Sequence, residues 1–527
     1  MLLNYFLTIL SSPMAVMTLG KVVSHPMPSL YEQSRLFDLE VDGEKMHTVS
    51  YAQYDYAHLS MDGGHSTIFR VTALGEEEIT SYSISPHRLN INARVDGNEL
   101  IFSLAEPRYL IIKINSVKEF VVLVDPTETA VPNIKDDDVY NVLDYGADNT
   151  GESLNDGIQN ALDAAGKHPG STVYVPKGLY LAPNLKIRNH TSLYLASGAV
   201  LRFTGHSADY ETMYTKSDLG PGTWWIQTEF DSTDIKVYGR GVLDGNGKYT
   251  RDNDFMNDIL VPAGTKNFEC DGILVRDSGF WAVTPIQVED ATLTNIKILN
   301  RLDVTQDDGI DVVESQRVRV KRSIAIANDD SYSTKTWPYK TGTTVPYPYP
   351  PRRQDDVVFD DCFAWTGCMG FKVGQGVHEH QDNIRFQNSA IYKAGVGIAV
   401  HHLFGNSTAS NITFEDIEIE RLAGSPGGFA SWLLLIIQEG GRGVGSVEDI
   451  VVRNILARTQ GSRPGFIQGY NDKVKVDGVT LSNIYMYANA TPATTLEEMN
   501  ILNTNYSEDI DIDNSLLGGI VGPIIHT

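Results

Sequence analysis

Residues 306–335 read QDDGIDVVESQRVRVKRSIAIANDDSYSTK and hold two carboxylate motifs, Asp307-Asp308-Gly309-Ile310-Asp311 and Asn328-Asp329-Asp330. The motifs lie in strand-like sequence, and Asp308 and Asp330 are 22 residues apart. A coil of a right-handed parallel β-helix takes roughly twenty-odd residues, so this spacing predicts the same position on adjacent coils, about 4.8 Å apart. When carboxylates lie that close together, their repulsion raises the pKa of at least one of them. A protonated carboxyl beside an ionised one is what acid/base hydrolysis of glycosides requires.

Strand-like sequence recurs from residue 140 to about residue 483. We expect strands at 173–180, 193–195, 235–238, 293–298, 318–320, 384–386, 412–414, 450–452 and 479–481, many of them next to Asn, Asp or Gly. This repetition with almost no helix is typical of a solenoid, although periodicity alone also allows an antiparallel sandwich. One amphipathic window, with Ile158, Ala161, Leu162 and Ala165 on one face, precedes the first coil and favours the solenoid, whose open end needs a cover.

The sequence before residue 130 has a different organisation. Short alternating strands are expected at 36–41, 68–73, 89–95, 99–104 and 109–114, separated by turn signals. Such spacing indicates an N-terminal β-sandwich over residues 29–129. Residues 130–139 form the predicted linker, and residues 140–527 form the predicted β-helix domain. The fold class is therefore all-β, a right-handed parallel β-helix with an N-terminal β-sandwich.

Charge and the first residues bear on partners and location. The formal net charge of −25 argues against nucleic acid or an anionic membrane as partner. The run before Lys21 is apolar and uncharged, which indicates a signal peptide over residues 1–24, with a membrane anchor as the alternative. Five sequons fit a secreted extracellular glycoprotein; they begin at Asn189, Asn406, Asn411, Asn489 and Asn505.

The chain has three cysteines, too few for a structural zinc site by themselves. Cys362 and Cys368 are close enough in sequence to bridge, which would leave Cys270 free. The sequence does not decide whether they do. His378 and His380 form a His-x-His pair, but a lone pair on a strand is more often an ordinary polar pair than a metal site, so we expect no metal.

Five segments make the chain resemble the polygalacturonase family of glycoside hydrolases. They are Gly239–Gly245, Ser278–Trp281, the two aspartate motifs and Ser331–Lys335. The resemblance covers about residues 140–420 and implies a right-handed β-helix. It also implies that Asp329 is the general acid, while Asp308 and Asp330 share the water that attacks C1 from the opposite face. Such chemistry inverts configuration, with acid and base carboxyls about 6.5–9.5 Å apart, and it needs no cofactor.

The alternative for these aspartates is a polar turn ladder, because Asp and Asn are common in β-helix turns. Departures from the family concern the substrate. Gln306-Asp307 stands where the family has Asn-Thr, and Gly367–Gly370 lacks the expected histidine. Ala399-Val400-His401 has lost the arginine and lysine that bind a galacturonate carboxylate. A buried uronate needs a cation, so these losses favour a neutral or lightly charged glycan. Cations elsewhere are the alternative clamp: Arg352, Arg353, Lys372, or His401 with His402.

The N-terminal domain is similar to the sandwich that precedes the β-helix in the dextranase and isopullulanase family. The similarity rests on Ile84-Ser85-Pro86, on residues 100–107 and on residues 121–126. Gln306 also matches the Gln-Thr-Asp-Gly motif of that family, which implies an α-glucan hydrolase as the alternative activity.

We expect a set of substrate-binding residues around the aspartates. The set is Gln306, Asp307, Trp281, Lys335, Trp337, Trp365, Lys372 and His401. Sugar rings stack on aromatic faces, although core packing is the alternative role for each tryptophan. The Pro-rich insertion Trp337–Arg353 indicates a rigid surface loop beside the site.

The sequence thus predicts a secreted, monomeric, inverting glycoside hydrolase that cleaves α-glycosidic bonds in a polysaccharide. Two other classes remain open. A polysaccharide lyase would need Ca²⁺ ligands and a basic residue as catalyst, and a non-catalytic glycan-binding protein would keep the fold without turnover. The sugar, the linkage and the choice between internal and terminal cleavage are open.

Overall fold

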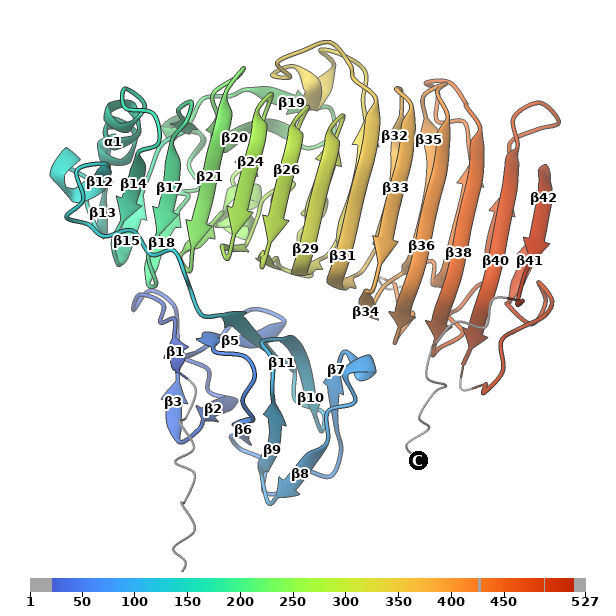
Figure 1. Ribbon diagram of the computed structural model, residues 1–527, viewed down its shortest axis with the longest axis horizontal. Helices are drawn as coiled ribbons and strands as arrows, with labels where there is room; N and C mark the ends of the chain where they lie inside the picture. Colours follow the sequence, from blue (N-terminus) through green and yellow to red (C-terminus); the bar gives the residue numbers. More distant parts are fainter. Residues whose placement is uncertain (1–20, 425–427, 488, 516–527) are drawn as a thin grey trace, which may run out of the picture.

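The computed structural model describes residues 21–424, 428–487 and 489–515. They form a β-sandwich and a right-handed parallel β-helix, with the sandwich lying against one side of the coils (Figure 1). Within these residues no helix is long and apolar enough to span a bilayer. The predicted fold class is confirmed.

Two sheets make the sandwich and enclose its own apolar core. One holds β1 (Val22–Ser24), β4 (Thr48–Val49), β5 (Tyr54–Met61), β7 (Tyr82–Ser85), β10 (Tyr109–Ile114) and β11 (Glu119–Pro126). The other holds β2 (Phe37–Val41), β3 (Glu44–Met46), β6 (Thr67–Ala73), β8 (Ala93–Asp96) and β9 (Glu99–Leu104). The predicted strand 89–95 is wrong in its first half, because His87–Leu89 is the 3₁₀ turn η1.

The sandwich begins earlier than predicted. Strand β1 pairs with β5, with Val22 opposite Met61, and His25 directly after it is buried. The boundary at residue 29 is therefore too late, and a signal peptide ending at residue 24 would remove β1. Residues 1–20 of the predicted signal lie outside the described residues.

A long parallel sheet runs the length of the β-helix. Its strands are β12 (Val139–Asn141), β13 (Thr150–Leu154), β14 (Thr172–Val175), β15 (Gly178–Leu181), β17 (Ser192–Leu195), β18 (Ala199–Arg202), β21 (Thr233–Gly239), β22 (Val242–Asp244), β24 (Lys266–Asp271), β25 (Leu274–Arg276), β26 (Glu289–Thr294), β27 (Lys297–Leu299), β29 (Gln316–Ala327), β31 (Gln354–Thr366), β33 (Gln381–Gln387), β34 (Ala390–Lys393), β36 (Ala409–Ile419), β38 (Val447–Ala457), β40 (Val476–Met486) and β42 (Ser507–Ile512). The strands expected in the β-helix domain fall in this sheet.

Two shorter sheets close the coils on the other side. The first holds β16 (Leu185–Ile187), β19 (Tyr214–Lys216), β20 (Gly220–Thr228) and β23 (Met256–Val261). The second holds β28 (Ile310–Val313), β30 (Tyr332–Thr336), β32 (Met369–Val377), β35 (Val396–Phe404), β37 (Ser431–Ile437), β39 (Gly465–Gln468) and β41 (Ile501–Asn503). Inward side chains alternate with outward ones along these strands, so the outward face is free to carry chemistry.

Helix α1 (Gly157–Ala165) lies at the open end of the first coils (Figure 1). All four apolar residues of the predicted window are buried there, as the cover of the core requires. The remaining helical segments are short: η2 (Val142–Tyr145), η3 (Ser207–Asp209), α2 (Gly247–Asp252) and η4 (Gly342–Thr344).

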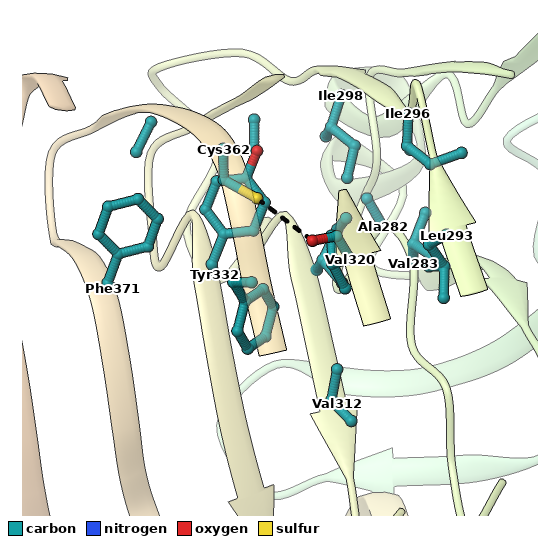
Figure 2. Close-up of a cluster of buried hydrophobic side chains, with 14 of the residues drawn as sticks. Ala282, Val283, Leu293, Ile296, Ile298, Val312, Val320, Tyr332, Cys362 and Phe371 are labelled. Atoms are coloured by element: carbon teal, nitrogen blue, oxygen red, sulfur yellow. Dashed lines mark hydrogen bonds between the residues drawn. The ribbon is translucent and has the colours of Figure 1, made fainter. Parts of the chain in front are cut away.

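The interior of the coils is a continuous apolar stack. Figure 2 shows Tyr332, Phe371 and Cys362 among aliphatic side chains of neighbouring coils. The Cys362 thiol donates to the carbonyl of Val320 at 3.9 Å, and all three cysteines are free. Cys362 and Cys368 therefore form no disulfide.

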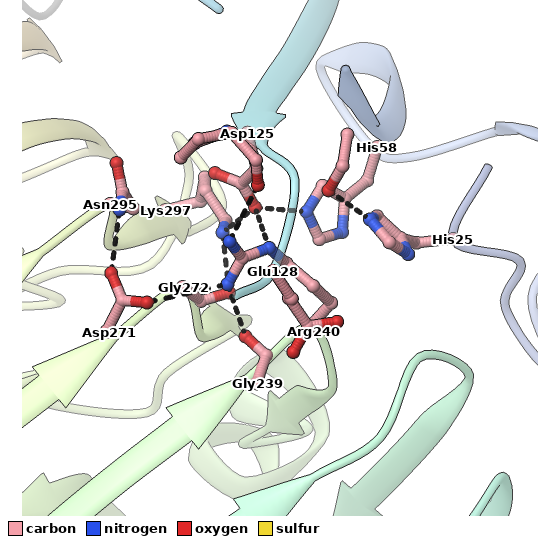
Figure 3. Close-up of polar contacts among 12 residues, drawn as sticks. His25, His58, Asp125, Glu128, Gly239, Arg240, Asp271, Gly272, Asn295 and Lys297 are labelled. Carbon is pink, nitrogen blue, oxygen red and sulfur yellow. Dashed lines mark hydrogen bonds and ion pairs between the residues drawn. The ribbon is translucent and has the colours of Figure 1, made fainter. Parts of the chain in front are cut away.

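A buried ionic cluster joins the two domains (Figure 3). Asp125 of β11 lies 2.5 Å from Lys297 Nζ, 3.3 Å from Arg240 Nε and 2.8 Å from His58 Nε2. All four side chains are almost fully buried. Ionic groups without water are stable only when paired, so the sandwich and the β-helix are held together where these pairs form.

Candidate active site

The strand register brings the two aspartate motifs together. Ile310 of β28 pairs with Tyr332 of β30, an offset of 22 residues. The backbone N–H of Gly309 donates to the carbonyl of Asp330 at 2.8 Å. Asp308 and Asp330 each stand two residues before these paired positions, so they lie on adjacent coils as their spacing predicts.

Lys335 lies at the centre of the carboxylates. Its Nζ is 2.5 Å from Asp308 Oδ2, 2.7 Å from Asp311 Oδ1 and 3.9 Å from Asp330 Oδ2. The same atom is 4.5 Å from the centroid of the Trp281 ring. The side chain is only 4% exposed, so its ammonium is held by these groups and not by water. Burial alone would lower the pKa of Lys335, but Asp308 and Asp311 outweigh it and keep the lysine charged.

Asp330 is held ionised. Its Oδ2 forms an ion pair with Lys372, whose side chain is also buried. Burial alone would raise the pKa of Asp330, but the ammonium groups of Lys372 and Lys335 outweigh it and lower that pKa. Asp330 therefore supplies a carboxylate to the site across the ordinary pH range.

Asp329 has the opposite tendency. Burial raises its pKa to about 7, and the charges of Asp308 and Asp330 add to the effect. Its Oδ1 accepts the backbone N–H of Asp330 at 3.0 Å, and its carbonyl accepts the hydroxyl of Thr366. One residue thus keeps its proton near neutral pH beside a neighbour that has lost one, which is the division needed for acid/base chemistry.

Asp258 of β23 is a fifth carboxyl near the site, and the sequence analysis did not identify it. Burial raises its pKa to about 8, and the Tyr214 hydroxyl donates to its Oδ2 at 2.5 Å. Bridges from Leu260 to Val283 and from Val283 to Ile310 place it two coils ahead of Asp308. Those coils have offsets of 23 and 27 residues instead of 22, so counting back from the motif does not find it.

The family model "Glycosyl hydrolases family 28" matches residues 170–507. The chain belongs to this family. It is 23% identical over 219 residues to "Probable polygalacturonase" of Vitis vinifera, a match that spans 37% of this chain and 44% of that protein.

Two solved structures share the fold of this family 28 chain. The family 28 exopolygalacturonase of Yersinia enterocolitica has a TM-score of 0.56 at 15% identity, covering 86% of this chain and 96% of its own. Dex49A from Penicillium minioluteum has a TM-score of 0.58 at 12% identity, covering 92% and 95%. At such identities the likeness concerns the fold alone.

Two of the expected substrate-binding residues have structural roles in this family 28 chain. Asp307 is fully buried, and its Oδ1 accepts the backbone N–H groups of Asn328 and Asp329 at 2.9 and 3.1 Å, so it holds the turn of the second motif. Trp365 packs on Tyr54 of the sandwich, with ring centroids 5.4 Å apart. Both interpretations as sugar contacts are corrected, because backbone donors occupy one side chain and the sandwich covers the other.

The remaining expected residues lie around the carboxylates or on neighbouring strands of the same sheet. Gln306 is half-buried just before the first motif, with a left-handed φ of 57°. Trp337 is half-buried where the Pro-rich insertion begins, its ring centroid 6.0 Å from that of Phe404. His401 Nε2 lies 2.9 Å from Gln438 Oε1, and burial lowers the pKa of His401 to about 4.

Most cations named as a replacement carboxylate clamp are already paired. Arg352 lies 3.5 Å from Glu289, and Arg353 lies 3.5 Å from Asp355. Lys372 is bound to Asp330, and His402 lies 2.8 Å from the Ser407 carbonyl. Each of these side chains therefore already has a polar partner among the described residues.

Lys216 of β19 differs from these cations. Its Nζ lies 5.4 Å from the centroid of the Phe280 ring, and no carboxylate of the described residues comes within 4.0 Å of it. Burial lowers its pKa, against the opposing charges of Asp308 and Asp329. Lys216 is thus a half-buried cation close to the aspartates and without an ion-pair partner in the described chain. No sequence motif contains it, so sequence reasoning could not find it.

Proposed function

We propose that this family 28 protein is a secreted inverting glycoside hydrolase that cleaves α-glycosidic bonds in a polysaccharide. The observation that carries the proposal is the contrast between two neighbouring carboxyls. The pKa of Asp329 is raised to about 7, while that of Asp330 is lowered by its lysine partners. An inverting hydrolase needs one protonated and one ionised carboxyl at the same bond.

In the proposed reaction Asp329 donates its proton to the glycosidic oxygen as the bond to C1 breaks. A water held by Asp308 and Asp330 attacks C1 from the opposite face and gives its proton to that carboxylate pair. Lys335 contacts Asp308 and lies near Asp330, so its positive charge holds both side chains in place. Trp281 is no longer assigned to stack on a sugar, because its ring is buried between Phe280 and Lys335 and supports the lysine.

We propose a neutral or lightly charged glycan as substrate. The paired state of Arg352, Arg353 and Lys372 supports this, because a uronate would have to displace an existing ion pair to bind them. A dextranase- or isopullulanase-type α-glucan hydrolase is the alternative within neutral substrates, and the N-terminal sandwich supports it.

A uronate-containing glycan is a second candidate, and Lys216 favours it. A half-buried ammonium without a carboxylate partner is the group that a sugar carboxylate would satisfy. The variant Lys216→Met separates the candidates. A uronate substrate predicts at least about a tenfold rise in KM with Lys216→Met, whereas a neutral glycan predicts a change below about twofold.

The proposal is tested by incubating the protein with pectin, rhamnogalacturonan, dextran, pullulan and xylan, and measuring new reducing ends. We expect release from at least one polysaccharide, lost in Asp329→Asn and retained in Asp290→Asn. Asp290 is an exposed aspartate paired with Arg317 and serves as the matched control. If the wild type and Asp329→Asn both bind a glycan and neither releases reducing ends, the non-catalytic alternative is supported. Activity that disappears with a chelator would support a lyase.

We also propose that the protein is exported and acts as a monomer. The apolar first segment and the five sequons support export. Because β1 is part of the sandwich, we expect the mature chain to retain Val22. N-terminal sequencing of protein recovered from the medium tests export, and light scattering tests the monomer.

A further inference from the structure

The turn between β31 and β32 brings a cysteine to the aspartate pair. The Sγ of Cys368 and one carboxylate oxygen each of Asp329 and Asp330 all lie within 4.8 Å of one another. Thr366 fixes this arrangement: its hydroxyl donates to the Asp329 carbonyl and accepts the backbone N–H of Cys368 at 2.8 Å. Three potential metal ligands from two adjacent coils therefore converge on one point.

Asp330 has an unused acceptor within this group. The residue is 1% exposed, and its Oδ2 is taken by Lys372. Its Oδ1 is buried and has no hydrogen-bond partner of ordinary geometry among the described residues. The weak thiol donor of Cys368 does interact with the Asp330 carboxylate. A buried carboxylate oxygen without a strong donor is costly, and a cation would satisfy it.

We propose that Asp329, Asp330 and Cys368 bind a thiophilic divalent cation, Zn²⁺ or Cd²⁺, and that the bound ion inhibits the enzyme. Two carboxylate oxygens and one thiolate supply three ligands, and water completes a tetrahedral site. On binding, the thiol releases its proton to solvent, as does Asp329 if protonated, while the metal keeps its oxidation state. The ligand atoms close around the ion by side-chain rotation.

The surrounding charges select the kind of cation. Lys372 and Lys335 both lie at Asp330 and offset much of its negative charge. Hard ions such as Ca²⁺ and Mg²⁺ bind through oxygen charge alone, so they gain little here. Zn²⁺ and Cd²⁺ gain a bond to sulfur that the lysines do not weaken to the same degree. The site is therefore expected to depend on Cys368.

Inhibition follows from the position of the ion and rests on the proposed function. An Asp329 oxygen bonded to a metal has no proton to give to a glycosidic oxygen. Turnover should therefore fall as the site fills and return when a chelator removes the ion. Binding itself does not depend on the reaction, so it is measured separately.

The experiment titrates the full-length protein with Cd²⁺ and follows the ultraviolet charge-transfer band of a cadmium–thiolate bond. We expect a one-to-one band in the wild type and in Cys270→Ala, whose lost thiol is buried in the core away from Asp329. In Cys368→Ser the band should vanish and Zn²⁺ affinity, measured by calorimetry, should fall at least tenfold. A Cys368→Ser protein that binds Zn²⁺ within twofold of the wild type overturns the site, as does equal binding of Ca²⁺.

The inhibition is measured on whichever polysaccharide proves to be cleaved. Zn²⁺ should lower the turnover of wild type and Cys270→Ala, with recovery after addition of a chelator. Zn²⁺ that binds through Cys368 without slowing turnover overturns the inhibitory role. If no polysaccharide is cleaved, the proposed function fails while the cadmium band still decides the metal site.

Discussion

The side chain of Asp329 illustrates how position in the fold changes the pKa of an aspartate. Burial, with the charges of Asp308 and Asp330, raises its pKa to about 7, whereas Asp330 next to it in sequence has a lowered pKa because of Lys372 and Lys335. The two roles proposed for these neighbours therefore depend on the ion pair that Lys372 forms with Asp330.

This contrast predicts the pH dependence of turnover. The general acid must be protonated, so kcat should fall as pH rises through about 7, the pKa of Asp329. Asp330 must be ionised, and its pKa is lowered. Protonation of Asp330 should therefore reduce kcat only at pH values below the usual pKa of an aspartate. A kcat–pH profile tests both limbs; turnover that stays level from pH 6 to pH 9 would contradict the role of Asp329.

Asp308 gives a second prediction at this scale. It contacts Lys335 and is assigned to hold the attacking water, so Asp308→Asn should lower kcat at least about 10²-fold. Asp290→Asn, which removes a charge from an exposed ion pair, should change kcat less than twofold. Steady-state kinetics of both variants at the optimum pH make the comparison, and wild-type turnover in Asp308→Asn would remove it from the mechanism.

At the scale of elements, the parallel pairing of β28 with β30 places three aspartates around one lysine. Lys335 on β30 lies within 4.0 Å of Asp308, Asp311 and Asp330, from both coils. In this arrangement the lysine is needed for the coils to tolerate buried carboxylates, because Asp308 and Asp311 would otherwise lack a counter-charge among the described residues.

Removing that lysine should destabilise the fold. Lys335→Met leaves Asp308 and Asp311 without their ion-pair partner, and breaking a buried ion pair typically costs about 3–5 kcal/mol. Lys321→Met, on the exposed face of β29, is the control and should change stability by less than about 0.5 kcal/mol. Urea denaturation followed by circular dichroism measures both, and equal midpoints for Lys335→Met and wild type would show that the lysine does not offset the carboxylates.

Sequence periodicity predicted the elements unevenly. The long sheet was predicted well, since strands such as Ile412–Phe414 alternate cleanly and their coils meet in regular register. The sheet that carries the site was hidden, because its offsets vary from 22 residues between β28 and β30 to 39 between β30 and β32. The second of those coils contains the Pro-rich insertion, which lengthens it without changing the pairing.

Sequence spacing also identified only part of the candidate site. The 22-residue spacing identified Asp308 and Asp330, because both lie in one regular coil. Asp258 and Lys216 come from earlier coils of different length, and no local pattern marks them. Trp365 was misplaced because a strand has two faces, and the sequence does not show that the sandwich covers the outer one.

At the scale of the whole molecule, the sandwich is bound to the β-helix through buried charges as well as apolar contacts. Asp125 meets Lys297, Arg240 and His58 at the junction (Figure 3). The same interface buries Tyr54 and Trp365. The sandwich is therefore expected to unfold together with the β-helix in one transition.

His58 gives this junction a pH dependence. Burial lowers its pKa from 6.5 to about 4, so between these values the unfolded chain binds a proton that the folded chain excludes. Stability should rise with pH over this window and fall as pH drops from 6.5 to 4, by up to roughly 3 kcal/mol from His58. Denaturation at several pH values gives the free energy of unfolding as a function of pH, and its slope should be shallower in His58→Gln than in the wild type. An unchanged slope would show that His58 does not cause the pH dependence.

The central claim is that carboxyls from adjacent coils cleave an α-glycosidic bond with inversion. The most direct measurement is ¹H NMR of the first product released from the polysaccharide that the protein cleaves, recorded before mutarotation. The account predicts that the new reducing end appears first as the β-anomer. Initial formation of the α-anomer would contradict it, because retention requires a covalent intermediate that this division of roles excludes.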